Sequence, residues 1–401
     1  MSLRGRSTGL LVAVGISLAA QSDASGLEPA EAMTRISAPA IRGHMTFLSD
    51  DLLEGRGTGS RGYDLAAAYV ASQFAALGLE PAGDSSSYFQ MVPFRRADLI
   101  VSAANGQLIG PKGKQKLQYE DDFIYSKDPV HEATSLEAPL VYVGYGVTAR
   151  EFDYDDYAGI DVRGKIVVYW RGAPPRFPHN ELAYYSDTDV KLRNAVERGA
   201  VGAFSMRKPS AASKLPWARL VANNVTPGIY WLARDGRIAG AFPEIQVSGI
   251  LSEAGAGKAF AHAPHDLEDA LKAAESSRPM SFELGISGRF ERKTRHTPVR
   301  SANVAGLWPG SDAQLKHEIV VVTAHLDHLG IGLPANGDSI YNGAYDNASG
   351  VGIMLEVAKA VTSLSRPPRR SILFLAVTAE EKGSLGSEYF TEDPTRPLTD
   401  L

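Results

Sequence analysis

Three short clusters of imidazole and carboxylate side chains could do chemistry in this 401-residue sequence. They are His325-Leu326-Asp327-His328, Asp346-Asn347-Ala348-Ser349-Gly350 and Glu380-Glu381. The chain contains no cysteine, which excludes disulfides, thiolate metal sites and cysteine nucleophiles. Any metal must therefore be held by His, Asp and Glu. Any nucleophile must be a hydroxyl, a carboxylate or an activated water.

Each cluster stands alone as a weak signal. In an extended chain, residues i and i+2 point to the same side, so Asp327 could lie beside a metal-binding His325 and fix its tautomer. A polar loop explains the same residues equally well. Asp346 and its neighbours are typical N-cap residues, and two adjacent glutamates such as Glu380-Glu381 usually form a solvated turn.

The elements expected around the clusters bring them together. Residues 318–324 and 371–377 are apolar runs, which are typical of strands buried on both faces of a parallel sheet. Residues 347–363 between them have the periodicity of a helix. Its expected apolar face is Val351, Met354, Leu355, Ala358 and Val361. This order predicts a βαβ unit, in which ligands bind at the carboxyl ends of the strands.

Four side chains would then meet at one sheet edge. A two-ion site, with ions about 3.5–4 Å apart, needs a bridging carboxylate and a general base. His325, Asp346, Glu380 and Glu381 supply a terminal ligand, a bridge, a base and a second terminal ligand. His328 is close enough to line this site, but we do not assign it as a ligand.

The motif order resembles the zinc-dependent exopeptidase family of aminopeptidase Y, bacterial leucyl aminopeptidase and glutamate carboxypeptidase II. The similarity covers His-x-Asp, Asp-Asn-Ala-Ser-Gly and Ala-Glu-Glu, with their spacing and the intervening helix. Residues 48–56 and 78–81 are similar to that family's N-terminal region. Residues 144–146 through 161–165 resemble the protease-associated (PA) domain that is often inserted in it.

The resemblance implies a fold and a domain organisation. The fold class is α/β, a zinc-exopeptidase (phosphorylase/hydrolase-like) mixed sheet flanked by helices, with an inserted β-rich PA domain. The expected parts are the N-terminal part of the peptidase domain at 28–125, the PA domain at 126–285 and the zinc peptidase core at 286–401.

The resemblance also implies roles. His325 and Glu381 would each ligate one of two co-catalytic Zn²⁺ ions, Asp346 would bridge them and Asp327 would support His325. Glu380 would activate a water that bridges the metals and then protonate the leaving amine. The implied activity is removal of N-terminal residues from a peptide substrate.

Two departures from the family pattern matter. Many relatives carry an acidic residue where this chain has Tyr345. The family also needs one further acidic ligand beyond the Glu-Glu pair and a later histidine, and the sequence ends at Leu401 before either. We therefore expect a C-terminally truncated product with an incomplete metal shell and little or no activity.

Three other functions compete with the aminopeptidase hypothesis. A carboxypeptidase of the same family would use the same metal residues. A glutaminyl cyclase has a similar fold but a single zinc. A non-catalytic binding protein, as among transferrin-receptor-like relatives, would carry a degenerate site, whereas the motif residues present here are all chemically competent.

The N-terminus predicts export. Arg4 and Arg6 precede a 12-residue apolar run, Gly9 to Ala20, whereas a membrane-spanning helix needs about 20 residues. This is the order of a secretory signal peptide, predicted over residues 1–24, although a buried N-terminal helix would share the pattern. We expect a secreted or periplasmic protein without a membrane anchor.

Composition limits the partners. The chain is 44% hydrophobic and 22% charged, as in soluble globular proteins. Its net charge of −5 gives no electrostatic case for nucleic acid. A protein partner would bind through the PA domain.

Further elements are expected outside the site. Helices are predicted over 28–50, 63–77 and 189–198, and strands over 139–147, 164–170 and 199–205.

Overall fold

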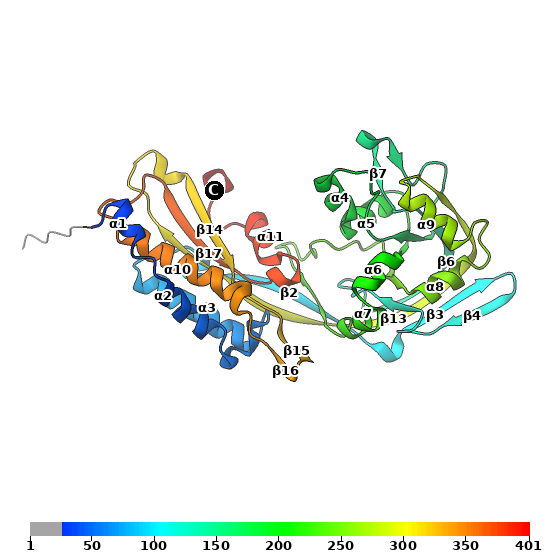
Figure 1. The fold of residues 1–401 in the computed structure, drawn as a ribbon, viewed down its shortest axis with the longest axis horizontal. Coiled ribbons are helices and arrows are strands. Elements are labelled where there is room, and N and C mark those ends of the chain that lie inside the picture. The colour runs from blue at the N-terminus through cyan, green and yellow to red at the C-terminus, as the bar shows by residue number, and fades with distance from the viewer. Residues whose placement is uncertain (1–25) are drawn as a thin grey trace, which may run out of the picture.

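The computed structural model describes residues 26–401, so the predicted signal peptide lies outside the described residues. Two lobes lie side by side and share one long strand, β13 (Ser281–Trp308) (Figure 1). The second half of β13 pairs with β2 (Phe89–Leu99), whereas its first half pairs with β6 (Ala133–Val143). We call the lobe that contains both residue 26 and Leu401 lobe 1 and the other lobe 2.

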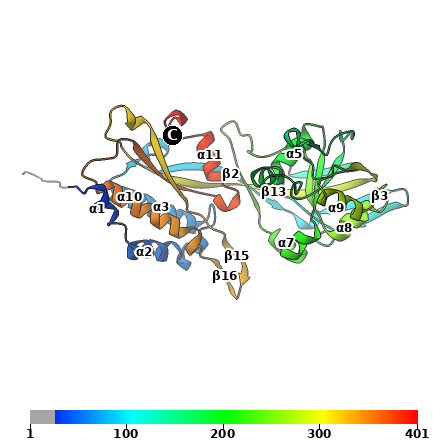
Figure 2. The same cartoon turned by 45° about the horizontal axis from the view of Figure 1, so that its top comes forward.

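Lobe 1 contains the predicted βαβ unit. Strands β14 (Ile319–His325) and β17 (Ser371–Val377) are parallel, and α10 (Ser349–Thr362) joins them. Strand β17 also pairs antiparallel with β13, which makes the sheet mixed. Helices α2 (Ala38–Leu48) and α3 (Arg61–Ala76) pack with α10 along one face (Figure 2). The α/β fold class predicted from the sequence is confirmed.

The remaining elements of lobe 1 are short. They are α1 (Pro29–Met33), β1 (Glu80–Pro81), β11 (Gly228–Trp231), the hairpin β15 (Gly330–Ala335) and β16 (Asp338–Tyr341), and α11 (Leu385–Glu392). Strand β11 pairs with β2, although the chain on both sides of it belongs to lobe 2.

The helix predicted over 28–50 is wrong as a single helix. The chain forms α1 and α2 instead, with a break before Ser37, whose hydroxyl accepts a hydrogen bond from the Ala40 amide. Pro39 lies in the first turn of α2, where its missing N–H costs nothing. The helix predicted over 63–77 is confirmed as α3, and Gly78 follows it with φ +75°, the left-handed conformation of a helix C-terminus.

The expectation that residues 318–324 are buried on both faces is also wrong. Among the described residues β14 pairs with β17 alone, and Val320 and Val321 are 47% and 37% exposed. Helix α10 contacts β14, but β14 is an edge strand in the described residues and keeps a solvent-facing side. In contrast, β17 has strands on both sides, and Leu373 to Val377 are buried.

Lobe 2 is built on a parallel core of β6, β9 (Ile166–Trp170), β10 (Gly202–Met206) and β12 (Val247–Leu251). The strands predicted over 139–147, 164–170 and 199–205 correspond to the first three, and the predicted helix to α5 (Thr188–Val196). Phe123, Phe204 and Phe290 pack against one another in its core.

Antiparallel strands extend this sheet at both ends. They are β3 (Asn105–Gly110), β4 (Gly113–Leu117) and β5 (Phe123–Tyr125), with β7 (Thr148–Ala149) and β8 (Tyr154–Asp155) as a separate pair. The covering helices are α4 (His179–Ser186), α6 (Pro209–Lys214), α7 (Trp217–Asn223), α8 (Glu253–Phe260) and α9 (Leu267–Glu275). Residues 105–125 thus share a sheet with lobe 2 although we assigned them to the N-terminal peptidase part. Within residues 26–401 no helix combines the length and apolar character that crossing a membrane requires.

Candidate metal centre

The carboxyl ends of β14 and β17 meet at one sheet edge. His325 is the last residue of β14 and pairs with Val377 at the end of β17. The next residue, Leu326, still donates its amide to the Val377 carbonyl. The loops that start here carry Asp327 and His328 on one side and Glu380 and Glu381 on the other, so parallel pairing brings the first and third clusters together.

Asp346 reaches the same edge from the turn before α10. Its carboxylate Oδ1 lies 2.9 Å from His325 Nε2. The helix-capping role that the sequence also allowed for Asp346 is taken by its neighbour. Asn347 Oδ1 accepts the Gly350 amide at 2.9 Å. Ser349 donates to the Tyr345 carbonyl instead of capping the helix. The Asp346 carboxylate is thus left to the site, where its side chain is 62% exposed.

His325 is held on both ring nitrogens. Nε2 faces Asp346 and, at 3.8 Å, Glu380 Oε2. Nδ1 lies 3.1 Å from the backbone carbonyl of Asp327, whereas the Asp327 carboxylate is 3.9 Å away. A backbone carbonyl therefore orients this imidazole where the sequence analysis expected a carboxylate.

The Asp327 carboxylate orders the opposite loop. It is fully buried and accepts the amides of Glu380 at 3.0 Å and Glu381 at 3.3 Å. The hydroxyl of Thr58 donates to the same carboxylate. Burial raises the pKa of Asp327 to about 6, opposed by the Glu380 amide and by His325. Asp327 is a positioning residue that turns both glutamates toward the histidines.

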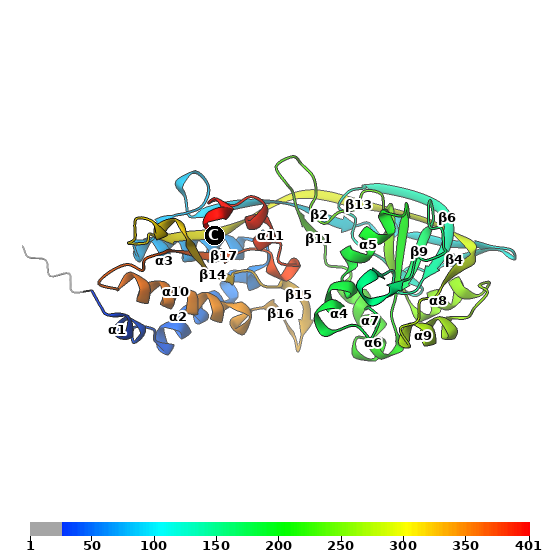
Figure 3. The same cartoon turned by 90° about the horizontal axis from the view of Figure 1, so that it is seen from above.

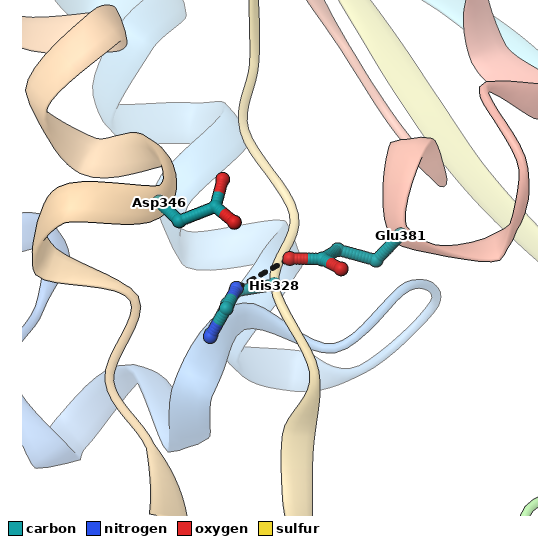
Figure 4. Close-up of side chains that lie close together, drawn as sticks. All are labelled: His328, Asp346 and Glu381. Atoms are coloured by element: carbon teal, nitrogen blue, oxygen red, sulfur yellow. Dashed lines mark hydrogen bonds and ion pairs between the residues drawn. The ribbon is translucent and has the colours of Figure 1, made fainter. Parts of the chain in front are cut away.

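His328 completes a second group on the other side of Asp346. Its Nδ1 lies 2.6 Å from Glu381 Oε1. One ligand atom each from His328, Asp346 and Glu381 lie within 4.8 Å of one another, and the three side chains point toward a common space (Figure 4). The sequence analysis placed His328 at the site without making it a ligand. The sequence signal for His328 as a site residue was its short spacing from His325.

The donor set fits zinc. Two imidazoles and three carboxylates are the nitrogen and oxygen ligands from which thiolate-free zinc sites are built. Asp346 adjoins His325 on one side and the His328–Glu381 pair on the other, so its carboxylate can be shared between two ions. The predicted residues His325, Asp346, Glu380 and Glu381 all lie at this edge; their roles stay a prediction.

Arg56 is a positioning residue that the sequence analysis missed. It is 1% exposed and donates to the carbonyls of Leu48, Leu326, Asn342 and Gly343. These carbonyls belong to the end of α2, the loop after β14 and the segment before Asp346. Burial lowers the pKa of Arg56 to about 10, opposed by Asp327 and Asp346. Its place in the similar segment 48–56 was the only sequence signal.

Gly55 permits this arrangement. Its φ is +66°, and a Cβ there would lie 2.5 Å from the Tyr341 carbonyl oxygen. Only glycine accepts both the left-handed backbone and the close approach.

Asn303 anchors the glutamate loop from beneath. Its Oδ1 accepts the Thr378 amide at 2.9 Å, and its Nδ2 donates to the Gly386 carbonyl at 2.8 Å. The loop between these two residues carries Glu380 and Glu381. Because Asn303 lies on β13 and is fully buried, the loop is tied to the strand shared by both lobes.

Comparison with solved structures defines the fold. An aminopeptidase from Aneurinibacillus sp. strain AM-1 superposes with a TM-score of 0.52 at 20% identity, over 93% of this chain and 69% of that chain. At that identity the match shows a shared fold, an α/β fold with a mixed sheet.

Sequence comparison finds a similar family for one segment of the chain. Residues 303–400, which contain all three clusters, match the model of Peptidase family M28. This segment of the chain is similar to that family, and over it the resemblance to zinc exopeptidases is confirmed.

Two individual relatives are proteins named aminopeptidases. Aminopeptidase YwaD of Bacillus subtilis (strain 168) is 37% identical over 97 residues, which are 24% of this chain and 18% of the relative. Aminopeptidase NAALADL1 of Rattus norvegicus is 42% identical over 60 residues, or 14% and 8% of the two chains. The matched segment thus spans less than a fifth of either curated relative.

Proposed function

We propose that this chain forms the catalytic site of a zinc-dependent aminopeptidase that acts on peptides. The observation that carries the proposal is the convergence of two imidazoles and three carboxylates at the shared ends of β14 and β17. This edge lies in the segment that matches Peptidase family M28, and proteins named aminopeptidases are among the relatives.

We assign the zinc-ligand roles from the positions of the side chains in the site. His325 and Asp346 would hold one zinc ion, and His328, Glu381 and the shared Asp346 a second. Bound zinc would supply positive charge that polarises the scissile carbonyl and stabilises the developing oxyanion.

Glu380 is the proposed general base. Its carboxylate is 40% exposed and lies 3.8 Å from His325 Nε2. It makes no side-chain hydrogen bond with any residue in 26–401, so it is free to take a proton from an attacking water. The same carboxyl group then protonates the leaving amine. Asp327 holds the Glu380 backbone in place for this transfer.

Hydrolysis of aminoacyl-nitroanilides with added zinc tests the proposal. Strong zinc-dependent cleavage would contradict the low activity expected from the family pattern. At whatever rate the chain turns over, Glu380→Gln should lower kcat by about 10²–10⁴-fold with zinc binding unchanged. Glu392→Gln, on the exposed end of α11, is the matched control and should keep full activity. Equal kcat for Glu380→Gln and the unaltered chain would remove Glu380 from the chemistry.

The same assay separates the competing functions. Cleavage of C-amidated but not N-blocked peptides supports the aminopeptidase, and the reverse pattern indicates a carboxypeptidase. One zinc per chain with glutaminyl cyclisation indicates a cyclase. Tight peptide binding without turnover indicates a binding protein.

We further propose export and an inserted module. The N-terminal pattern supports cleavage near residue 24, which mass spectrometry of the exported protein would detect. Lobe 2 as an inserted PA domain is supported by its connections, since the chain leaves lobe 1 along β2 and returns along β13, its direct neighbour. A protein partner would bind on this lobe.

A further inference from the structure

The hairpin of β15 and β16 begins and ends beside the candidate metal ligands. Strand β15 starts two residues after His328, and β16 ends five residues before Asp346. The hairpin projects from lobe 1 in Figures 1 and 2, and Figure 3 shows it at the end of this lobe nearest to lobe 2. A molecule held at the metal centre therefore lies next to the base of this hairpin.

The base of the hairpin packs closely against the metal centre. A Cβ at Gly55 would lie 2.5 Å from the carbonyl oxygen of Tyr341 and 2.7 Å from that of Gly330. A Cβ at Gly343, where the chain returns from the hairpin, would lie 2.6 Å from Cγ of His328. Both strands are thus fixed where they leave the site, so the hairpin has a defined direction relative to His328.

Large apolar side chains around the hairpin reach solvent. Each is at least 44% exposed, and they are Leu52, Leu329, Ile331, Leu333 and Tyr345. Three of them lie within five consecutive residues that begin beside His328, and Leu52 belongs to the turn that contacts both strands. Single exposed apolar side chains are common on protein surfaces, whereas a contiguous group of them marks a binding surface.

The two faces of the hairpin differ. Tyr341 covers one face, because its hydroxyl donates to the Leu333 carbonyl at 2.8 Å and a Cβ at Gly332 would lie 2.8 Å from its ring. Ile331 and Ile340 are paired directly across the two strands, and residues paired in this way lie on the same face. The hairpin thus presents an apolar face on which Ile331 stays largely open to solvent.

We propose that the hairpin binds the extended, apolar part of a peptide whose N-terminal residue lies at the metal centre. A peptide is the occupant because the apolar group continues directly from His328 and Asp346, and this choice rests on the proposed function. Strand β15 has six residues and is about 20 Å long at ~3.3 Å per residue. It is therefore long enough to contact the residues that follow the cleaved one.

The hairpin then determines substrate preference beyond the N-terminal residue. A valine side chain that leaves water to pack on Ile331, Leu333 or Ile340 stabilises the complex, whereas a serine in its place contributes little. The expected preference is for peptides with apolar residues after the first, whichever residue the metal centre holds.

Binding of labelled peptides to the full chain tests the proposal without turnover. The probe is a hexapeptide with a free N-terminal leucine, valine at its third to fifth positions and a C-terminal fluorescein. A matched peptide has serine at those positions. A chelator prevents cleavage, and fluorescence anisotropy gives the affinities. We expect the valine peptide to bind at least about tenfold more tightly than the serine peptide.

Substitutions in the hairpin locate the binding surface. Ile331→Ser and Leu333→Ser should each weaken binding of the valine peptide by about threefold or more and leave the serine peptide unchanged. Met33→Ser and Leu65→Ser remove exposed apolar side chains elsewhere on lobe 1 and are the matched controls, which should bind like the unaltered chain. Thermal unfolding verifies that all four variants keep the fold.

Three results would overturn the proposal. They are equal affinity for the two peptides, full affinity for the valine peptide in both hairpin variants, or sedimentation that shows a dimer of the chain which dissociates in Ile331→Ser. The last result would assign the hairpin to contact between two copies. Failure of the proposed function is distinguishable, because a lack of aminoacyl-nitroanilide hydrolysis counts against the aminopeptidase alone, whereas these binding results concern the hairpin.

Discussion

At the scale of single residues, His328 and His325 each lie close to a different carboxylate of the site. Each imidazole has a carboxylate within 3 Å, Glu381 for one and Asp346 for the other. Such close nitrogen–oxygen approaches are what a chain shows when several ligands are aimed at one small space. His328 is the proposed ligand that the sequence analysis did not assign, so it provides the sharpest test of the geometry.

Replacing His328 by Gln should lower zinc affinity by about tenfold or more, because an amide is a poor substitute for imidazole nitrogen. Competition with a chromogenic chelator measures the affinity, and thermal unfolding verifies that the fold is kept. His317→Gln, on the exposed turn before β14, is the control and should bind zinc normally. Unchanged zinc affinity in His328→Gln would show that His328 only lines the site.

Much of the site could be predicted because its residues follow periodic elements. The apolar runs and the helix between them predict that His325, Asp346, Glu380 and Glu381 meet at one edge, and the structure places them there. The roles of Asp327 and His328 depend on the course of a three-residue loop, and no periodicity encodes that course. Asp327 turns to the amides of Glu380 and Glu381 because they are the unpaired donors within reach.

At the scale of elements, Arg56 joins three segments that are distant in the sequence. It lies 270 residues from Leu326 and 287 from Gly343, so no local pattern could have revealed these bonds. The position of β14 in the sheet could not be predicted from local sequence either. Its apolar sequence suits a central strand as well as an edge strand, and only the arrangement of neighbouring strands distinguishes the two.

Arg56→Met should destabilise lobe 1 by at least about 3 kcal/mol, because four carbonyls lose their buried donor. Zinc affinity should fall as well, since the segment before Asp346 loses its anchor. Urea unfolding followed by tryptophan fluorescence measures the first effect. Arg61→Met, with a 68% exposed side chain, is the control, and a similar loss there would contradict the argument.

The turn after β6 predicts a pH dependence. Asp156 accepts the amides of Tyr145 and Val147 and the Tyr154 hydroxyl. Burial raises its pKa to about 7, whereas an unfolded chain has the ordinary value of about 3.9. The folded state therefore holds a proton that the unfolded state releases between these values, and stability falls as pH rises through this window.

The loss of stability with rising pH should disappear in Asp156→Asn, because an amide does not titrate. Its amide oxygen can still accept both backbone N–H groups. Between pH 4.5 and 6.5 we expect the unaltered chain to lose up to about 1.4 kcal/mol per pH unit relative to this variant. Urea unfolding midpoints measured across this pH range give the loss of stability in each protein. Asp153→Asn, an exposed matched change, should follow the unaltered chain, and parallel curves for Asp156→Asn would refute the assigned burial effect.

At the scale of the whole molecule, β11 connects the lobes. It belongs in sequence to lobe 2 but pairs with β2 of lobe 1. Trp231, at its end, is 6% exposed and packs with Val92, Phe94 and Tyr389. Its indole N–H donates to Glu388 of α11. The segment that leaves lobe 2 to form β11 therefore contacts the helix that follows the loop carrying Glu380 and Glu381.

Trp231→Ala should cost about 3–5 kcal/mol, the usual penalty for removing a buried tryptophan, and should loosen α11. Hydrogen exchange should rise in α11 and in residues 378–384, while the core strands of lobe 2 keep their protection. Trp217→Ala, on partly exposed α7, should have a smaller cost and leave α11 unchanged. If exchange in α11 stayed the same in Trp231→Ala, the glutamate loop would depend on Asn303 and Asp327 alone, and lobe 2 would have no mechanical link to the metal centre through β11.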